Sequence, residues 1–412
     1  MAWQLRAEAV GWPGTLNGLI AMIYTFDEPI DRHGTLSVKW DSAQDAGVLP
    51  MWVADMDFRV AQPILDAIQR RVAHGVFGYT RVPEEYYKAV IGWFSARHGW
   101  DIARESILYL PGVVPALSVA IKALTSPGDG VLVQTPVYNC FFSSIRNNAC
   151  RVVENPLKRV MLEEGFTYEM DYEDLEKKAA EPGVKLMLLC NPHNPAGRVW
   201  TAQELARVAE ICQRHGVVVV SDEIHCELTM PGYKYTPFAP IAERMGVGYL
   251  VCNAATKAFN IAGLQLANIV CPDAEKRAKI DRAINVNEVC DVNPLGVVAT
   301  IAAYTQGAEW LEQLREYLLA NYQDFTNYVR EHFPQFPVAR LEGTYLAWMD
   351  CSSLGIPVAE LEHRLRSEAK LWLNAGTMYG AAGEGYIRWN LACPRARMLE
   401  GLERFGRWVG TR

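Results

Sequence analysis

Paired cysteines, clusters of basic residues and long apolar runs are all missing from this 412-residue sequence. Its ten cysteines are scattered, with none in a C-x-x-C pair, and several lie inside apolar runs, which is typical of buried thiols in a reducing compartment. The net charge of −7 comes from interspersed charges, so nucleic acid is not an expected partner. No apolar run approaches the ~20 residues that span a bilayer. These absences predict a cytoplasmic protein that binds neither nucleic acid nor a membrane, and no metal site is predicted.

The beginning of the chain contains an apolar stretch, residues 16–23, that has the look of a signal-peptide core. Only Arg6 precedes it as a basic residue, Asn17 and Gly18 interrupt it, and no convincing cleavage site follows. Export is therefore not expected. Because the segment from Met22 onward is a better natural beginning, we expect residues 1–21 to be an N-terminal extension or a mis-assigned start.

The chain is long and apolar enough (50% hydrophobic residues) for two domains. Between residues 107 and 270, short runs of Val and Leu without polar alternation are separated by helical patterns, which indicates strands buried on both faces. We therefore predict an α/β fold with a mostly parallel central sheet flanked by helices and a smaller α/β C-terminal domain. Residues 22–70 are expected to join the small domain, with a large domain at 71–304 and the small domain at 305–412. No internal repeat or low-complexity linker is present.

The predicted elements follow the hydrophobic periodicity. Strands are expected at residues 107–110, 130–133, 151–153, 185–189, 217–220, 249–251, 267–270, 344–349 and 385–390, and helices at 63–75, 86–98, 114–124, near 141, and at 172–180, 202–215, 295–304, 310–332, 359–368 and 395–409. In parallel sheets, ligands bind at the carboxyl ends of the strands. Asp55 and Asp57 lie within an apolar run outside these elements, so they are either buried with partners or line a cleft.

Lys257 stands in a small-residue turn after the apolar run from Tyr249 to Val251. A strand end can hold its amine in a cleft, where desolvation lowers the pKa of a lysine and leaves a neutral amine that attacks a carbonyl. Taken alone, a lysine in such a turn is more often a solvated charge. The other residues at strand ends decide between these two interpretations.

A lysine Schiff-base enzyme that uses pyridoxal phosphate needs an acid against the pyridine nitrogen and a donor to the ring hydroxyl. Asp222 ends the strand that contains Val217 to Val220 and can keep the pyridinium protonated, although a turn or helix-cap acid fits the same position. Asn194 can donate to the ring oxygen, although Asn-Pro turns are common. The Asn194–Pro195 bond is also a candidate for cis geometry.

The same cofactor needs amides for its phosphate and an arginine for the substrate carboxylate. Gly112, Val113 and Val114 lie where the chain enters a helix, so their free amides can hold a phosphate. Tyr138 can lie flat on the ring, or be part of the core. Arg388 lies mid-strand between apolar residues and needs an anion, which is either a substrate carboxylate or a structural salt-bridge partner.

Several motifs, in the same order along the chain, resemble the fold-type I pyridoxal-phosphate enzymes of the class I/II aminotransferase superfamily from Met22 to Arg412. Within that superfamily the sequence is similar to the MalY/PatB-type cystathionine β-lyases, which are cysteine-S-conjugate C–S lyases. The motifs are M-W-V-A-D-M-D-F (51–58), N-P-H-N-P-A-G-R-V-W (191–200), S-D-E-I-H (221–225), T-K-A-F-N (256–260), G-T-Y-L-A-W (343–348) and I-R-W-N-L-A-C-P-R (387–395).

The resemblance implies a role for each candidate residue. Lys257 is implied to carry the cofactor and to act as the base. The cofactor would be bound further by the pyridinium partner Asp222, the ring-oxygen donor Asn194, the stacking ring Tyr138, the phosphate ligands Val113, Val114 and Thr256, and His225. The substrate would be bound by the carboxylate ligand Arg388 and by Asn194. Tyr79 is implied to reach the phosphate of the neighbouring subunit, which makes the protein a homodimer with shared sites. Tyr24, Trp52 and Ala54 are expected to contribute to the substrate pocket.

The sequence departs from the wider superfamily at three places. His225 stands where many aminotransferases have Tyr, Ala254 where a phosphate-binding Ser is common, and Gln265 where many relatives have a phosphate-binding Arg. We therefore expect backbone amides, the helix dipole and Tyr79 to bind the phosphate.

The function implied is β-elimination from cystathionine or a related cysteine S-conjugate, giving pyruvate, ammonia and a thiol. Transamination shares every step up to the carbanion and remains the alternative, because the preference for the lyase rests on family analogy. A regulatory protein that binds a transcription activator is a third reading, which the presence of Lys257, Asp222 and Arg388 disfavours.

Overall fold

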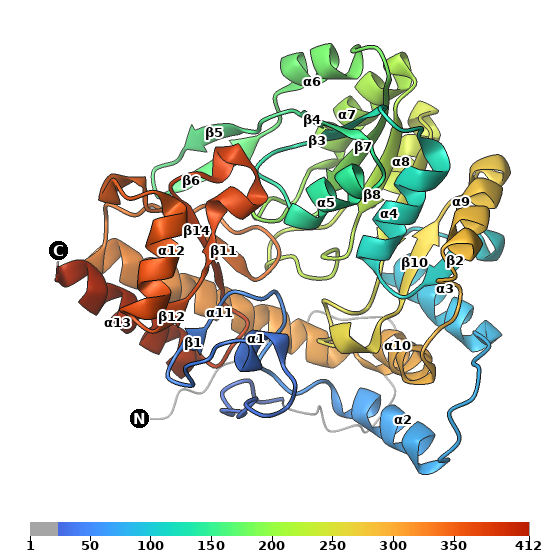
Figure 1. Ribbon diagram of the computed structural model, residues 1–412. Coiled ribbons are helices and arrows are strands. Elements are labelled where there is room, and N and C mark those ends of the chain that lie inside the picture. Colours follow the sequence, from blue (N-terminus) through green and yellow to red (C-terminus); the bar gives the residue numbers. More distant parts are fainter. Residues whose placement is uncertain (1–23, 412) are drawn as a thin grey trace.

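The structure is a computed structural model that describes residues 24–411 (Figure 1). The extension predicted at residues 1–21 lies outside the described residues. Within residues 24–411 no helix is long and apolar enough to cross a membrane. All ten cysteines fall in this range and have free thiols.

The central sheet has seven strands in the order β2-β10-β9-β8-β7-β3-β4. Its strands are β2 (Ile107–Leu110), β3 (Gly130–Val133), β4 (Arg151–Glu154), β7 (Val184–Cys190), β8 (Val218–Asp222), β9 (Tyr249–Asn253) and β10 (Ala267–Val270). Only β10 runs antiparallel to its neighbours within this sheet. The prediction of a mostly parallel sheet is confirmed, and the carboxyl ends of β2, β3, β7, β8 and β9 meet at one edge.

Helices cover both faces of the sheet. Alternate residues of β7 show why its sequence is apolar throughout, because Leu186 and Leu188 pack into one core cluster while Met187 and Leu189 pack into another. The first cluster includes α4 (Val113–Leu124), α5 (Asn139–Asn147) and α9 (Ala274–Val286), and the second includes α6 (Tyr172–Ala179), α7 (Ala202–His215) and α8 (Phe238–Met245).

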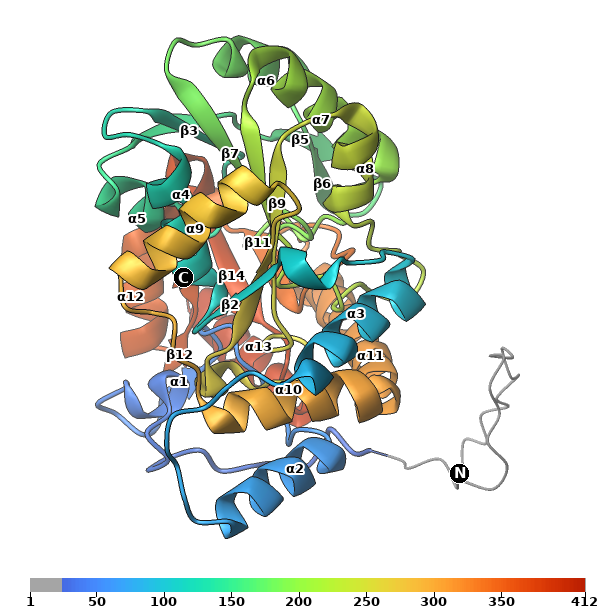
Figure 2. The same ribbon diagram turned by 90° about the vertical axis from the view of Figure 1, so that its right-hand side faces the viewer.

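A further helical layer is formed by α2 (Gln62–Ala73), α3 (Glu84–His98) and α10 (Pro294–Gln306). Figure 2 shows α2 and α10 side by side, and α10 also packs against α3. Gly99 ends α3 in the left-handed conformation (φ 62°), which a glycine adopts without a steric penalty. The predicted helix boundaries in this part of the chain are confirmed to within a few residues.

The C-terminal elements gather around a separate sheet at the lower left of Figure 1. This sheet has the strand order β11 (Leu346–Asp350), β14 (Tyr386–Asn390) and β13 (Asn374–Ala375), and it is accompanied by α11 (Ala308–His332), α12 (Val358–Ser367) and α13 (Arg395–Gly410). The N-terminal segment adds α1 (Val38–Asp41) and β1 (Leu49–Pro50), and β1 pairs in parallel with β12 (Leu371–Trp372). Trp40, Leu49 and Met51 share the core of the C-terminal elements. The domain boundaries given above stay a prediction.

Some elements were absent from the sequence-based prediction. The hairpin of β5 (Lys158–Met161) and β6 (Phe166–Glu169) was missed because no residue of β5 is buried, so the strand carries no apolar run. The prediction also omitted α9, which buries only Ile280, Ala283 and Ile284 among many charged residues. The helix α8 was missed as well.

The two acids of the apolar run at residues 51–58 both have ion-pair partners, and Asp57 is buried whereas Asp55 is half-buried. Asp57 is 1% exposed and lies within 3.1 Å of the cationic groups of Arg32, Lys39 and Arg397. Asp55 pairs with Arg32 at 2.7 Å. These ion pairs hold the N-terminal segment in place, which decides between the two interpretations of this run.

Candidate active site

Lys257 lies in the turn after β9, where the chain leaves the sheet edge. Its Nζ donates a hydrogen bond of 2.6 Å to the Ala54 carbonyl oxygen. Burial lowers the pKa of Lys257 from 10.5 to about 8, and the positive charge of Arg388 adds to this, while Asp55 and Asp222 oppose it. A substantial share of neutral amine is therefore present at mildly alkaline pH, which is what a nucleophile and general base requires.

Asp222 is the last residue of β8 and is buried. One carboxylate oxygen accepts a hydrogen bond of 3.1 Å from the Ile224 N–H. Burial raises the pKa of Asp222 to about 7, and the neighbouring Glu223 adds to this. Burial makes the negatively charged form of Asp222 unfavourable, and a cation bound next to this carboxylate would stabilise that form. The position therefore suits the protonated nitrogen of a heteroaromatic ring.

Arg388 lies in the middle of β14, where it is 3% exposed. Its Nη1 donates to Asn194 Oδ1 at 3.0 Å and its Nη2 to the Trp52 carbonyl at 2.9 Å. Its Nε has no hydrogen-bond partner, and none of the carboxylates in residues 24–411 forms an ion pair with it. The structural salt bridge considered for this arginine is therefore absent from the described part of the chain, and a buried guanidinium remains available for a carboxylate ligand.

Asn194 follows β7 and is buried beneath Arg388. Because its Oδ1 accepts from Arg388, its Nδ2 is the end of the side chain left to donate to a ligand oxygen. The Asn194–Pro195 peptide bond is cis, as considered from the sequence.

The predicted phosphate-binding end is the first turn of α4. Val113 is the first helical residue, and Gly112 precedes it without a side-chain cap. The leading N–H groups of a helix lack intrahelical partners and carry the positive end of its dipole, so this end suits an anion. Thr256 is buried in the turn next to Lys257. Ala254 is buried as well, whereas Gln265 is exposed and left-handed (φ 48°).

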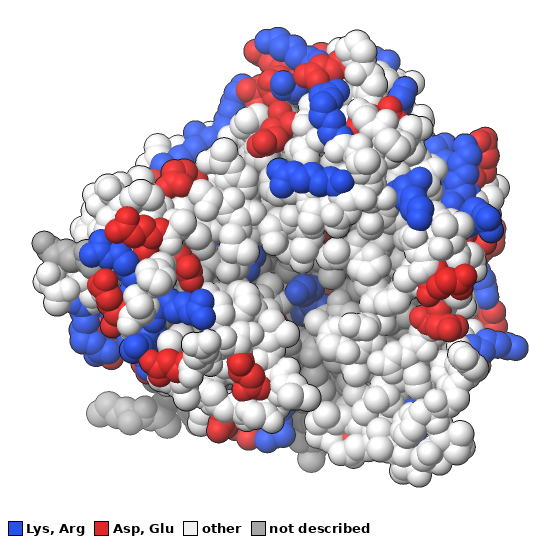
Figure 3. All heavy atoms as spheres, in the orientation of Figure 1, with Lys and Arg blue, Asp and Glu red and all other residues white. Residues whose placement is uncertain are grey.

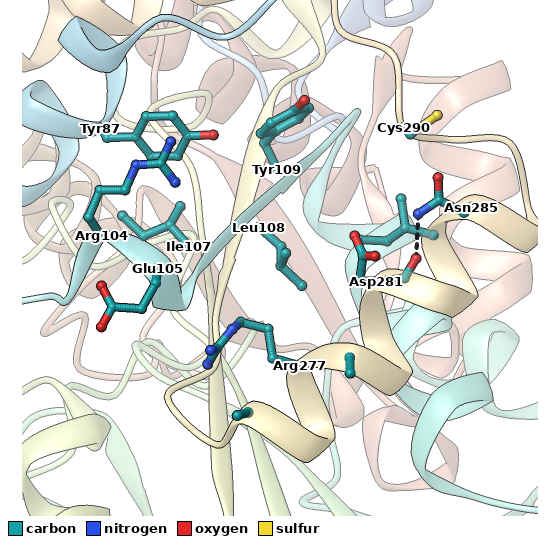
Figure 4. A pocket seen from close by; sticks show the side chains of 13 residues that line it. Tyr87, Arg104, Glu105, Ile107, Leu108, Tyr109, Arg277, Asp281, Asn285 and Cys290 are labelled. Atoms are coloured by element: carbon teal, nitrogen blue, oxygen red, sulfur yellow. Dashed lines mark hydrogen bonds between the residues drawn. The ribbon is translucent and has the colours of Figure 1, made fainter.

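Figure 3 shows a recess near the middle of one face, between the C-terminal elements on the left and α4 on the right, with basic side-chain atoms inside it. A different pocket of about 650 Å³ lies at the open edge of the sheet between β2 and α9. Figure 4 shows its lining, which includes Tyr87, Arg104, Tyr109, Arg277 and Asp281. None of the predicted site residues lines that pocket.

Comparisons with known proteins show the family to which the chain belongs. Residues 50–405 match the aminotransferase class I and II family. Cystathionine beta-lyase PatB of Bacillus subtilis (strain 168) is 43% identical over 383 residues, which cover 92% of this chain and 98% of the relative. The chain belongs to the MalY/PatB-type branch of the class I/II aminotransferase family.

Two solved structures of similar proteins have the same fold. Cystalysin of Treponema denticola, whose structure contains a pyridoxal 5′-phosphate cofactor, has a TM-score of 0.90 at 32% identity and covers 95% of this chain and 100% of its own. The pyridoxal-phosphate-bound C–S lyase of Staphylococcus hominis has a TM-score of 0.87 at 32% identity and covers 94% of this chain and 100% of its own. The predicted fold-type I architecture is thereby confirmed.

Other members of the predicted site in this MalY/PatB-type chain lie around the same cluster. Tyr138 precedes α5, and its pKa is raised by burial and by the Cys140 thiol, with Asp222 and Arg388 also within electrostatic reach. His225 is buried, and burial together with Lys257 and Arg388 lowers its pKa to about 3, so this imidazole is neutral. Its Nδ1 has no hydrogen-bond partner in the described residues.

The three residues expected at the substrate pocket differ in their contacts. Ala54 contacts Lys257 through its carbonyl oxygen. The Trp52 indole stacks on Trp372 at 4.3 Å between ring centroids, and only its carbonyl reaches Arg388. Tyr24 lies against α11, where its N–H donates to Gln313 at 2.8 Å. Their contact with substrate stays a prediction.

Sequence reasoning missed three residues of the cluster. Tyr345 is 1% exposed and donates from its hydroxyl to the Ala54 carbonyl at 2.9 Å. Tyr379 lies with its ring 4.9 Å from the Arg388 guanidinium carbon. Cys140 affects the pKa of Lys257 and Tyr138. Tyr345 lies inside the quoted motif at 343–348 and Cys140 lies two residues after the predicted Tyr138, so a signal was present for both, but nothing in the sequence around Tyr379 pointed to the site.

Tyr79 is the one predicted site residue whose side chain is almost fully exposed (99%) in the described chain. It lies in the loop between α2 and α3, with Val76 and Phe77 also exposed. The placement of Tyr79 at a phosphate of another subunit stays a prediction.

Proposed function

We propose that this protein is a cytoplasmic, pyridoxal-phosphate-dependent C–S lyase that acts on cystathionine or related cysteine S-conjugates. The products are pyruvate, ammonia and a thiol. The observation that carries the proposal is the buried Arg388, which has no carboxylate partner in the described residues and lies beside both Asn194 and the amine of Lys257. An L-amino acid that places its carboxylate on Arg388 brings its Cα next to a lysine base.

The residues fit the cofactor, since the buried Asp222 suits a protonated ring nitrogen and the buried His225 has an Nδ1 without a hydrogen-bond partner in the described residues. Pyridoxal phosphate, when bound through Lys257, supplies an electron sink for charge that develops at Cα of the substrate. Asp222 would pair with the ring nitrogen, Asn194 with the ring oxygen, and the first amides of α4 with the phosphate.

The residues of the chain then account for the elimination. The Arg388 guanidinium holds the substrate carboxylate, and the neutral Lys257 amine takes the proton from Cα. The electron pair left at Cα forms a double bond to Cβ as the C–S bond breaks, and the sulfur leaves as a thiolate. Water converts the remaining three-carbon fragment to pyruvate and ammonia.

The alternative is transamination, which would use the same residues to bind the substrate and to remove the proton from Cα, and would differ in the place to which Lys257 delivers that proton. The relatives named above as a cystathionine beta-lyase and a C–S lyase favour elimination. A regulatory partner protein would be detected by a pull-down, and its presence would be compatible with the enzymatic proposal.

The decisive experiment supplies L-cystathionine, L-cystine and S-alkyl cysteines to the purified holoenzyme without any keto acid. We expect stoichiometric pyruvate and thiol from at least one of them, measured with lactate dehydrogenase and a thiol reagent. Alanine serves as the control substrate because it has no leaving group at Cβ. Amino-group transfer only on addition of a keto acid, with no pyruvate in its absence, would contradict the lyase assignment.

We also propose a homodimer in which Tyr79 binds the phosphate in the partner subunit's site. A 99% exposed tyrosine next to the exposed Val76 and Phe77 supports an interface there. On the face shown in Figure 3, the surface over α2 and α10 carries few charged atoms, which also suits a surface that contacts another subunit. The exposed Gln265 and the buried Ala254 offer little charge to the phosphate, which increases the need for a further donor.

Tyr79→Phe is expected to weaken pyridoxal-phosphate binding by about tenfold or more, because a hydrogen bond to a charged group contributes about 1.5–3 kcal/mol. The measurement is the cofactor dissociation constant, obtained by absorbance titration of the cofactor-free protein. Tyr233→Phe, another exposed tyrosine, is the matched control and should leave that constant unchanged. Equal affinities for Tyr79→Phe and the unmodified protein would refute the contact.

Mixed dimers test whether Tyr79 acts across the interface. Tyr79→Phe subunits are refolded or exchanged with Lys257→Ala subunits. If Tyr79 crosses the interface, each mixed dimer has one complete site, formed by Lys257 of one subunit and Tyr79 of the other, with the cofactor affinity of the unmodified protein. If Tyr79 acts within its own subunit, no site of the mixed dimer contains both residues.

A further inference from the structure

The Ala54 carbonyl oxygen accepts two hydrogen bonds from opposite parts of the fold. Lys257 Nζ lies at 2.6 Å, in the turn after β9 of the large sheet. The Tyr345 hydroxyl lies at 2.9 Å, just before β11 of the C-terminal sheet. Ala54 belongs to neither sheet, since it lies in the N-terminal segment after β1. One backbone oxygen therefore joins three separate segments at the amine of the site.

The peptides around Ala54 are fixed by β14. Asn390 Nδ2 donates to the Val53 carbonyl and, at 2.6 Å, to the Asp55 carbonyl. Two residues earlier on the same face of the strand, Arg388 Nη2 donates to the Trp52 carbonyl. The carbonyls on both sides of Ala54 are thus held by β14, while that of Ala54 is turned to Lys257 and Tyr345.

We propose that Tyr345 is a positioning residue that holds the Ala54 carbonyl as the acceptor for the Lys257 amine whenever that amine is free. This inference rests on the proposed function of Lys257 as a base. A neutral amine has two N–H groups and one lone pair, so a fixed acceptor for one N–H restricts the directions in which the lone pair points. After the amine takes a proton, the same oxygen stabilises the ammonium.

Besides the Ala54 carbonyl, several charged or titratable groups lie near the Lys257 amine. Arg388, Asp55, Asp222 and Cys140 all affect the pKa of Lys257 electrostatically, and Lys257 in turn affects His225. The Tyr345 hydroxyl donates its hydrogen bond to the Ala54 oxygen, so its effect on the amine is expected to pass through that oxygen.

The test begins with the cofactor-free protein and needs no substrate. Lys257 is acetylated in competition with a reference amine over a range of pH, and its labelling is read by peptide mass spectrometry. In Tyr345→Phe the carbonyl is held less firmly against the amine, so the ammonium form loses stabilisation and the pKa of Lys257 falls below its value of about 8. Amide hydrogen exchange of residues 51–57 is expected to become faster in the same variant.

The matched control is Tyr322→Phe, which also removes a tyrosine hydroxyl that donates to a backbone carbonyl, that of Ala339 at 3.1 Å. It should change neither the Lys257 labelling nor the exchange of residues 51–57. In the holoenzyme, Tyr345→Phe is expected to lower kcat by roughly tenfold with KM and cofactor affinity unchanged, because a misdirected base loses part of its rate contribution.

An unchanged pKa of Lys257 together with unchanged exchange of residues 51–57 would overturn the proposal, whatever happens to kcat. Because labelling and exchange are measured without substrate or cofactor, they report on Tyr345 even if the protein proves not to be a lyase. A failure of the lyase assignment would appear separately, in the absence of pyruvate from the unmodified holoenzyme.

Discussion

Lys257→Ala is expected to lower pyruvate formation by roughly 10⁴-fold, since both covalent attachment of the cofactor and general-base catalysis are lost. The variant should still bind some pyridoxal phosphate, because Asp222, Asn194 and the first turn of α4 are unchanged. Borohydride treatment followed by mass spectrometry should attach the cofactor covalently to the unmodified protein and not to the variant.

Lys279→Ala is the matched control for this experiment. Lys279 is an exposed lysine of α9 that pairs with Glu275, remote from the strand ends of the site. Its replacement should leave turnover and covalent attachment as they are. Retained lyase activity in Lys257→Ala would refute the assignment of the base, and covalent attachment at another lysine would refute the assignment of the cofactor site.

Asp222→Asn is expected to lower kcat by at least about 10²-fold, because removal of one preorganised electrostatic group from a catalytic site typically costs 10²–10³. The amide keeps the size of the side chain and an oxygen for the Ile224 N–H. What it removes is the negative charge that would pair with the ring nitrogen. Pyruvate assays at saturating cofactor measure the loss.

The same variant should stabilise the cofactor-free protein at alkaline pH. Burial raises the folded-state pKa of Asp222 from 3.8 to about 7, so the folded state holds its proton over a range in which the unfolded state has released it. The cost of ionising Asp222 is absent below about pH 4, grows between pH 4 and 7, and is complete above pH 7. A shift of this size corresponds to a free energy on the order of 4 kcal/mol.

We therefore expect Asp222→Asn to raise the free energy of unfolding of the cofactor-free protein by roughly 2 to 4 kcal/mol at pH 8 and by much less at pH 4.5, measured by urea unfolding. Asp273→Asn is the control, because it is expected to lower the free energy of unfolding at pH 8, whereas Asp222→Asn raises it. Asp273 caps α9 and Lys276 lowers its pKa, so it stabilises the fold at pH 8 and loses that contribution as the pH falls. A pH-independent effect of Asp222→Asn would contradict the buried-charge explanation.

The strands and helices that position the site were predictable because their signals are local. The unalternated apolar runs indicated strands buried on both faces, and Thr201 with Glu204 forms a capping box at the start of α7, which begins where it was predicted. The hairpin of β5 and β6 was not predictable in this way, because β5 has no buried residue and forms only by pairing with β6, which buries Phe166 and Tyr168 in the core.

Within the site, the residue types and their strand-end positions determined the candidates, and the tertiary structure decided between the interpretations that remained open. For Arg388, either a salt bridge or a ligand carboxylate was compatible with the sequence, and only the fold shows that no carboxylate of the described chain reaches it. For Lys257, a solvated charge and a buried amine were both compatible with a small-residue turn, and only the fold shows that burial lowers its pKa and that its amine donates to Ala54, 203 positions away.

By itself, then, the sequence determined the fold class, most of the strands and helices, and the candidate lysine, aspartate, asparagine and arginine, because periodicity and motif are properties of consecutive residues. The tertiary structure alone decided what surrounds them. The Ala54 carbonyl meets the Lys257 amine, and the Tyr345 hydroxyl meets that carbonyl, only when the N-terminal segment, the large sheet and the C-terminal sheet pack together. The Cys140 thiol comes within electrostatic reach of the amine in the same way, and no local pattern encodes contacts at such separations.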